Sequence, residues 1–429
     1  MVKVALPYGE REITMEIPDA NVMGIYSPRE VETVECIKAE IARALSNPIG
    51  CPSLRELAHG KTKVVLIADD NTRLTPTHEI IPVMLDELNA GGVADRDISV
   101  VIALGTHRDM TEEEILVKFG QEVVNRVAVY NHNYKDPRHL VDLGKTENGT
   151  PIQINKRVYE ADLAIGIGSI VPHHIPGFAG GAKIVQPGVS GEITTGATHL
   201  LSVKAPRSYL GVEDNPVRKE LNHIARLVGV NYILNTVLDR YGKVVKAFFG
   251  DVEEAFVEGV QVSKGVYAVE LPREADIVLS SSHPCNLEFW QAHKTLYPSD
   301  LAVKEGGIII VVTPCPEGVA KTHGEMIEYT GLSPWEVRAM LEEGVIADPV
   351  AAALAVAWGQ VKERARVFIV SDGISEMEAR KLGFEPFSSV EAALAEALRR
   401  EGPGAQVAVL THAPDMLPLI KTPAVVAVE

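Results

Sequence analysis

Short apolar segments that alternate with amphipathic helical patterns constrain the fold of this 429-residue chain more than any other feature. Residues 63–68, 97–104 and 162–169 each begin with one charged residue and continue as an apolar, β-branched run of strand length. Helical patterns separate these runs, and strands that alternate with helices usually pair in parallel. We therefore predict an α/β fold with a mixed or parallel sheet in a large N-terminal domain.

The length predicts more than one domain, because a single hydrophobic core rarely grows beyond about 300 residues. A second strand–helix series begins after a long helical pattern that ends near residue 269. We predict an N-terminal α/β domain over residues 1–265, which a last strand over residues 423–429 could join. A C-terminal α/β domain is predicted over residues 270–415, with the active site in the cleft between the two domains.

Local signals predict several individual elements. Residues 2–17 contain two alternating runs around a glycine turn, which is typical of a β-hairpin. A helix is predicted over residues 28–45, and another is predicted to begin with Thr75 as its N-cap and Pro76 at its first position. Thr111 and the glutamates after it form a capping box that opens a further helix.

The charge balance excludes some classes of partner. The formal net charge is −17, so the chain lacks the basic excess that neutralises nucleic-acid phosphates. No apolar run approaches the length of a membrane span, and the N-terminus has no apolar core like that of a signal peptide. We expect a cytoplasmic protein without nucleic-acid or membrane partners. An anionic substrate would need a locally basic pocket.

Polar side chains follow each of the three apolar strands. Asp70 and Arg73 come after the first strand, His107 after the second, and His173 and Lys183 after the third. In open α/β sheets, ligands bind outside the carboxyl ends of the strands. We therefore expect these five side chains to converge, although more than a hundred residues separate the first from the last.

A glycine-rich loop leads to the lysine that follows the third strand. Glycine lets the backbone adopt unusual conformations and come close to a ligand, which suits a bound anionic cofactor. The spacing does not match a nucleotide P-loop, because alanine precedes the lysine and isoleucine follows it. The loop glycines and the lysine are Gly177, Gly180, Gly181 and Lys183.

Histidines are the candidate acid–base groups, since imidazole titrates near neutral pH. His107 and His173 each follow an apolar strand and could exchange acid and base roles on opposite sides of one carbon. A zinc site built from His173, His174 and His199 is an alternative. No cysteine or carboxylate is spaced to complete such a site, and the lysine loop would then have no role.

Five motifs, in order between about residues 60 and 300, resemble the nickel-dependent lactate racemase family. Together they are far more specific than any single motif. They are Asp69–Pro76, Gly105–Arg108, Pro172–Lys183, Thr198–His199, and Gln291 with Lys294.

This resemblance implies a nickel-pincer nucleotide, pyridinium-3-thioamide-5-thiocarboxylic acid mononucleotide, held covalently on Lys183. It also implies that His199 completes the ligand set of the nickel ion, beside the carbon and sulfur donors of the cofactor. Separate maturation enzymes assemble this cofactor in the family. The implied cofactor-binding residues are Asp69, Asp70, Asn71, Thr72, His174, Gly180, Gly181 and Lys183.

The resemblance further implies a racemase or epimerase that inverts C2 of a 2-hydroxy acid by proton-coupled hydride transfer. His107 and His173 would exchange the hydroxyl proton, one on each side of C2. Arg73 and Lys294 would bind the carboxylate, and Gln291 would add hydrogen bonds.

Trp290 departs from the pattern of the family. Lactate-active members place a tyrosine there, and replacing phenol by indole removes a hydroxyl group and changes the shape of the pocket. The predicted substrate is therefore lactate or another 2-hydroxy acid, such as a malate-like, aromatic or sugar acid. Two alternatives stay open: a nucleotide-dependent ligase or kinase that uses Lys183 on phosphates, and a two-domain protein that binds an organic anion without chemistry.

Overall fold

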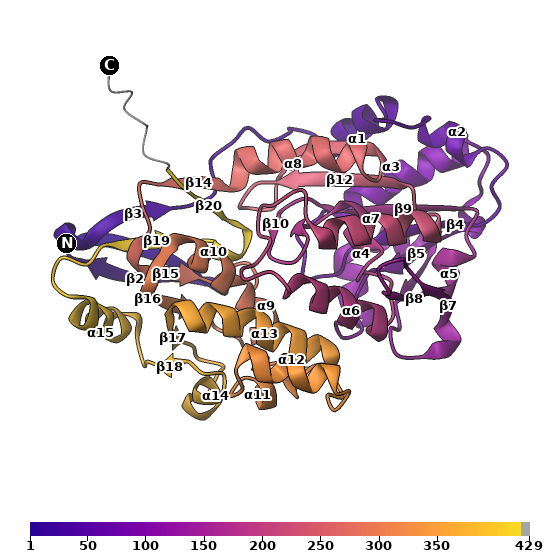
Figure 1. Cartoon of the computed structure of the whole chain (residues 1–429). Coiled ribbons are helices and arrows are strands. Elements are labelled where there is room, and N and C mark those ends of the chain that lie inside the picture. Colours follow the sequence, from indigo (N-terminus) through magenta and orange to yellow (C-terminus); the bar gives the residue numbers. More distant parts are fainter. Residues whose placement is uncertain (422–429) are drawn as a thin grey trace, which may run out of the picture. The chain divides into compact units, whose positions relative to one another are not determined.

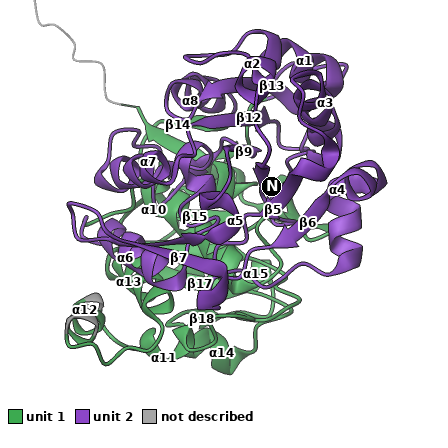
Figure 2. Cartoon of the chain, turned by 90° about the vertical axis from the view of Figure 1, so that its right-hand side faces the viewer, with its two compact units in different colours: residues 1–29, 206–210, 267–429 green, residues 30–205, 211–266 purple. Residues whose placement is uncertain are grey.

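The computed structural model describes residues 1–421, apart from the side chains at positions 334, 338, 341 and 342. The chain divides into two compact units (Figure 2). Unit 2 contains residues 30–205 and 211–266, and unit 1 contains residues 1–29, 206–210 and 267–429. Each unit is built around a six-stranded sheet and contains helices, so the predicted α/β class is confirmed.

The sheet of unit 2 has the strand order β13-β12-β9-β4-β5-β6. Figure 1 labels four of these strands, β12, β9, β4 and β5. All neighbouring strands run parallel except β13, which is antiparallel to β12, so the predicted mixed sheet is confirmed. The strands are β4 (Val64–Ala68), β5 (Ile98–Ile102), β6 (Ala128–Asn131), β9 (Leu163–Ser169), β12 (Tyr232–Leu238) and β13 (Val244–Asp251).

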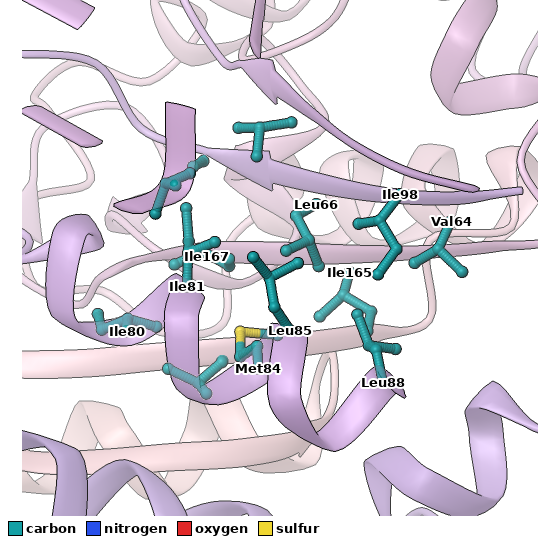
Figure 3. Packing of buried hydrophobic residues seen from close by; sticks show 14 of the residues in the cluster. Val64, Leu66, Ile80, Ile81, Met84, Leu85, Leu88, Ile98, Ile165 and Ile167 are labelled. Atoms are coloured by element: carbon teal, nitrogen blue, oxygen red, sulfur yellow. The ribbon is translucent and has the colours of Figure 1, made fainter. Parts of the chain in front are cut away.

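The main core of unit 2 lies where four helices pack on this sheet. Strands β4, β5 and β9 carry no charged residue, and their buried apolar side chains meet those of the helices. Figure 3 shows side chains of helix α3, among them Met84, Leu85 and Leu88, packed against strand residues such as Leu66 and Ile165. The four helices are α1 (Ile37–Ser46), α2 (Leu54–Ala58), α3 (Thr77–Ala90) and α4 (Glu112–Arg126).

The remaining elements of unit 2 include those that carry the third strand-end loop. Strands β10 and β11 form a two-stranded hairpin directly after β9, and the 3-10 helix η4 follows. These elements are β7 (Leu140–Lys145), β8 (Pro151–Asn155), α5 (Lys156–Tyr159), β10 (Pro172–His173), β11 (Gly177–Phe178), η4 (Gly181–Ile184), α6 (Glu192–Ser202), α7 (Pro216–Val228) and α8 (Glu254–Tyr267), besides the short 3-10 helices η2 (Asp95–Asp97) and η3 (Pro137–His139).

The sheet of unit 1 is parallel throughout, with the strand order β18-β17-β16-β15-β19-β3. Its strands are β3 (Val22–Tyr26), β15 (Ala275–Ser281), β16 (Val303–Val312), β17 (Arg366–Val370), β18 (Glu385–Pro386) and β19 (Val407–Leu410). The hairpin strands β1 (Val2–Tyr8) and β2 (Arg11–Ile17) contribute to its core. The other elements are η1 (Asp19–Asn21), β14 (Ala268–Leu271), α9 (Phe289–Ala292), η5 (His293–Thr295), α10 (Leu296–Ala302), α11 (Met326–Tyr329), α12 (Pro334–Glu342), α13 (Pro349–Arg364), α14 (Glu376–Lys381), α15 (Val390–Glu401), η6 (Ala413–Asp415) and β20 (Leu417–Ile420).

The first residues of the chain differ from the predicted domain organisation. Residues 1–29 belong to the unit of the C-terminal sheet rather than to a domain over residues 1–265, because β3 adds to that sheet as its edge strand beside β19. The predicted strand over residues 423–429 lies outside the described residues. None of the helices within residues 1–421 is both long and apolar enough to cross a lipid bilayer.

Two predicted helix starts are wrong, whereas the capping box at Thr111 is confirmed. The helix predicted over residues 28–45 begins only at Ile37, because Cys36 before it is extended and Val34 donates its backbone N–H to the carbonyl of Val244. Thr75 does not cap α3, since Pro76 occupies the N-cap position and the Thr75 hydroxyl bonds elsewhere.

Candidate functional site

Three loops of unit 2 leave the sheet at one edge, because β4 lies between its parallel neighbours β5 and β9. Backbone bonds continue the pairing past the strand ends: Ala103 donates to the carbonyl of Ala68 at 2.7 Å, and Asp69 donates to the carbonyl of Ile167 at 3.3 Å. The Asp69–Thr75 loop, the loop that carries His107 and the loop after β9 therefore start side by side, as the sequence pattern predicts.

A buried carboxylate orients one of the candidate catalytic histidines. Asp70 is 3% exposed, and its Oδ2 lies 2.6 Å from Nδ1 of His107, whose side chain is a quarter exposed. The other oxygen accepts the hydroxyl of Thr72 at 2.5 Å and its backbone N–H at 3.1 Å. Burial acts to raise the pKa of Asp70, but His107 and the guanidinium of Arg73 outweigh it and hold this pKa well below its ordinary value.

These contacts fix the roles of the ring nitrogens. Because Asp70 is ionised and can only accept, Nδ1 of His107 donates, and Nε2 carries the lone pair of the neutral ring. His173 is bonded differently: its Nδ1 accepts the backbone N–H of Ile175 at 3.2 Å, so the proton of its neutral ring is on Nε2. His173 and His174 are both buried and stack at 4.6 Å between ring centroids.

Asp69 accepts a hydrogen bond through one oxygen and forms an ion pair through the other. Oδ2 accepts the hydroxyl of Thr75 at 2.5 Å, and Oδ1 forms an ion pair with Nζ of Lys118 at 3.1 Å. Burial raises the pKa of Asp69 even though the ammonium of Lys118 opposes this shift. The predicted role of Asp69 in cofactor binding stays a prediction.

The glycine-rich loop has the backbone conformation that only glycine adopts easily. Gly177, Gly180 and Gly181 have φ values of +84°, +83° and +58°. A Cβ atom on Gly177 would lie 2.0 Å from the carbonyl oxygen of Val212, so another segment of the chain passes directly beside the loop. Lys183, the predicted attachment point, lies half-buried in η4, which directly follows this loop.

Two buried polar residues hold the glycine-rich loop, and the sequence reasoning missed both. Arg218 of α7 is 4% exposed and donates to the carbonyls of Pro176, Phe178 and Gly180. Asn235 of β12 accepts the backbone N–H of Gly181 at 2.8 Å. The sequence does contain a sign of Arg218: it is a charged residue on the stripe of α7 that is buried, where an apolar residue is expected.

His199 fits the chemistry of a metal ligand. It lies in α6, is half-buried, and has Nδ1 2.8 Å from the carbonyl oxygen of Thr195, one helical turn earlier. A metal-binding histidine typically donates one ring N–H to such a carbonyl and presents the other nitrogen to the metal. Within the described part of the chain, no three His, Cys, Asp or Glu side chains form a metal-binding group, so His173, His174 and His199 do not form the zinc site considered above.

The rest of the Asp69–Thr75 loop borders a cavity of about 920 Å³ in unit 2. Asn71 and Arg73 line it, together with residues of α1 and α4. Arg73 donates to the carbonyl and hydroxyl oxygens of Thr72, at 3.2 and 2.9 Å, and Asn71 donates to Glu114 at 3.2 Å.

The predicted substrate-binding residues of unit 1 lie together on α9 and η5. Lys294 donates to the side-chain oxygen of Gln291, and Gln291 and Trp290 are buried. The indole of Trp290 stacks on His323 at 4.0 Å with 20° between the planes. His323 in turn has Nδ1 2.6 Å from Asp348 Oδ2, so a second histidine–carboxylate pair fixes the indole.

Comparison with known proteins places the chain in a family. The lactate racemase N-terminal domain matches residues 8–211, and the lactate racemase C-terminal domain matches residues 271–417. The lactate racemase of Lactiplantibacillus plantarum is 32% identical over 438 residues, which cover 98% of this chain and all of that protein. The lactate racemase of Thermoanaerobacterium thermosaccharolyticum is 32% identical over 324 residues, 74% of this chain and 76% of that protein.

A solved structure shares the whole fold. The lactate racemase apoprotein from Thermoanaerobacterium thermosaccharolyticum superposes with a TM-score of 0.87 at 27% identity, covering 97% of this chain and 100% of that chain. Matches to both domain families, in the expected order and over most of the chain, agree with the five motifs found in the sequence. The chain therefore belongs to the lactate racemase family, a family of isomerases.

Proposed function

We propose that this chain is a racemase or epimerase that inverts C2 of a 2-hydroxy acid. The observation that carries the proposal is the pair of the buried Asp70 and His107, 2.6 Å apart, at the edge of the sheet where parallel α/β folds bind ligands. A carboxylate that fixes the tautomer of an imidazole is the usual support of a histidine base. Membership of the lactate racemase family supplies the class of reaction.

The side chains would divide the work as follows. Nε2 of His107 accepts the hydroxyl proton of the substrate, and Asp70 stabilises the imidazolium that results. His173 serves the opposite side of C2, where the Nε2–H of its neutral ring donates to the substrate oxygen. Arg73 and Lys294 are the candidate cations for the carboxylate.

A nickel-pincer nucleotide fits the donor set of unit 2, with Lys183 as its attachment point and His199 as the protein ligand of nickel. When bound, this cofactor supplies the group that accepts a hydride from C2 and returns it. Separate maturation enzymes would be the protein partners of the chain, and its cytoplasmic location stays a prediction.

The substrate is lactate or a related 2-hydroxy acid. Trp290 is 5% exposed and is fixed by its stack on His323, so it presents an indole in place of a phenol hydroxyl. An indole wall favours a larger or flatter side chain on the substrate over the methyl group of lactate.

The test uses protein co-expressed with cofactor maturation enzymes. Single enantiomers of lactate, malate, phenyllactate and a sugar acid are incubated with it, and inversion is scored by chiral chromatography. The expected result is inversion of at least one acid, together with a mass increase that disappears in Lys183→Arg. Failure to invert any acid by protein that carries the added mass would refute the proposal.

The same preparation separates the two alternatives. A nucleotide-dependent ligase or kinase would be stabilised by ATP against thermal unfolding, whereas a racemase would not. A binding protein would keep its affinity for the acid in His107→Ala. A racemase would lose turnover by roughly 10²–10⁴-fold in that variant, the range typical of an acid–base group.

A further inference from the structure

One buried lysine contacts the Asp69–Thr75 loop at three points. Lys118 of α4 is 9% exposed, and its Nζ lies 2.7 Å from the carbonyl oxygen of Arg73 and 3.0 Å from that of Thr75. The same Nζ lies 3.1 Å from Oδ1 of Asp69. The ammonium of Lys118 therefore donates to two carbonyls of this loop and forms an ion pair with a carboxylate of the same loop.

The backbone of Lys118 is tied to the same segment of the chain. Its carbonyl oxygen accepts the hydroxyl of Thr77 at 2.7 Å. Helix α4 is kinked at Gly120, where φ is +77°, and a Cβ atom there would lie 3.1 Å from Cβ of His78. At the kink, α4 lies close to the start of α3. Both the backbone carbonyl and the ammonium group of Lys118 therefore contact residues 69–77.

The contacts of Lys118 lie on both sides, in the sequence, of Asp70, the residue that orients His107. Asp70 lies between Asp69 and Arg73, and the backbone N–H of Arg73 donates to the carbonyl of Asp70 at 3.2 Å. Lys118 therefore anchors the loop immediately before Asp70 and again after it. A carboxylate positions an imidazole only if its own backbone is fixed, because a displacement of about 1 Å is enough to weaken catalysis strongly.

We propose that Lys118 is a positioning residue, which holds the Asp69–Thr75 loop so that Asp70 stays bonded to His107. Its consequence for turnover rests on the proposed function, whereas its consequence for the Asp70–His107 bond does not. No substrate, metal or cofactor needs to touch Lys118.

The first measurement is made on protein without cofactor. A short Nδ1–H bond to a carboxylate moves the imidazole proton far downfield in the NMR spectrum. Two such signals are expected, from His107 bonded to Asp70 and from His323 bonded to Asp348, since both pairs lie at 2.6 Å. His107→Gln and His323→Gln assign them.

Lys118→Met is expected to remove or shift the His107 signal and to leave the His323 signal in place as an internal reference. Lys362→Met is the matched control. Lys362 is a partly buried lysine that also donates to two carbonyls, of Thr330 at 2.7 Å and of Leu382 at 3.3 Å, but it lies in unit 1. That variant should keep the His107 signal. If Lys118→Met does not fold, Lys118→Gln takes its place in this measurement, because its shorter, neutral side chain removes the ammonium group that contacts the loop at three points.

The second measurement is turnover of the cofactor-loaded enzyme. Lys118→Met is expected to lower kcat by about 10²-fold, the loss typical of a small misplacement of a catalytic group. An unchanged His107 signal in Lys118→Met, or in Lys118→Gln if the first variant does not fold, would overturn the proposal. If Lys118→Met loses the His107 signal but keeps full turnover, the positioning role of Lys118 is supported. The role of His107 in the proposed function would then be refuted.

Discussion

Replacing Asp70 by asparagine tests the central pair of the candidate site. Asp70→Asn keeps the size of the side chain and removes the charge beside Nδ1 of His107. At an effective dielectric constant of about 20, two unit charges roughly 4 Å apart attract by about 4 kcal/mol. His107 is a quarter exposed, so solvent screening reduces the loss to roughly 2–4 kcal/mol. If His107 becomes an imidazolium in the transition state, kcat should fall by roughly 30-fold to 10³-fold.

The assay is the rate of inversion by cofactor-loaded enzyme, normalised to the mass increase on Lys183. Asp95→Asn is the matched control, because Asp95 is also a paired carboxylate of unit 2 but is bonded to Arg126 at 2.9 Å. The control should keep the wild-type rate. A rate for Asp70→Asn within about threefold of wild type would contradict the argument, since it would leave less than about 1 kcal/mol for the pair.

Stability provides a second readout of the same variant. The pKa of Asp70 is depressed in the folded protein, so its ionised form stabilises the fold above the unfolded-state pKa of about 3.9. This contribution is lost as the pH falls through the folded-state pKa. The difference in free energy of unfolding between wild type and Asp70→Asn should therefore be larger at pH 7 than below about pH 4, as measured by urea unfolding. A difference that does not depend on pH would show that the charge of Asp70 is not what stabilises the loop.

Three further substitutions have defined outcomes. Gly177→Ala should destabilise the protein by roughly 3 kcal/mol or more in urea unfolding, because φ is +84° and Val212 leaves no room for a Cβ atom. His199→Ala should lower the nickel content of loaded protein, measured by elemental analysis, and leave the added mass on Lys183. Trp290→Tyr should raise kcat/KM for lactate relative to an aromatic 2-hydroxy acid by about tenfold, measured by chiral chromatography. An unchanged ratio would show that this side chain does not set specificity.

The strands and the edge where they end could be predicted from the sequence. Residues 64–68, 98–102 and 163–169 contain no charged residue, and such short apolar runs become buried parallel strands in α/β proteins. Once the strands are parallel neighbours, the geometry of the sheet alone brings the loops after β4, β5 and β9 together.

The contacts of individual side chains could not be predicted, because they depend on partners far along the chain. Thr75 has the sequence context of an N-cap, yet its hydroxyl bonds to Asp69. His132 follows strand β6 in the same way as His107 follows β5, but it is buried between Ser190 and Asn155, and burial lowers its pKa to about 4. A histidine after a strand is therefore not enough to predict a catalytic base.

Asp69 and Asp70 are neighbours in one sequence motif, but their surroundings in the fold give the two carboxylates different roles. The two neighbouring carboxylates are both buried, yet the pKa of the first is raised and that of the second is lowered. Asp70 is hydrogen-bonded to the half-buried His107, whereas Asp69 accepts a hydrogen bond from Thr75 and forms an ion pair with the buried ammonium of Lys118. Ionised carboxylates only accept hydrogen bonds, so each can serve one set of donors well. The first aspartate therefore holds the loop together, and the second orients the imidazole.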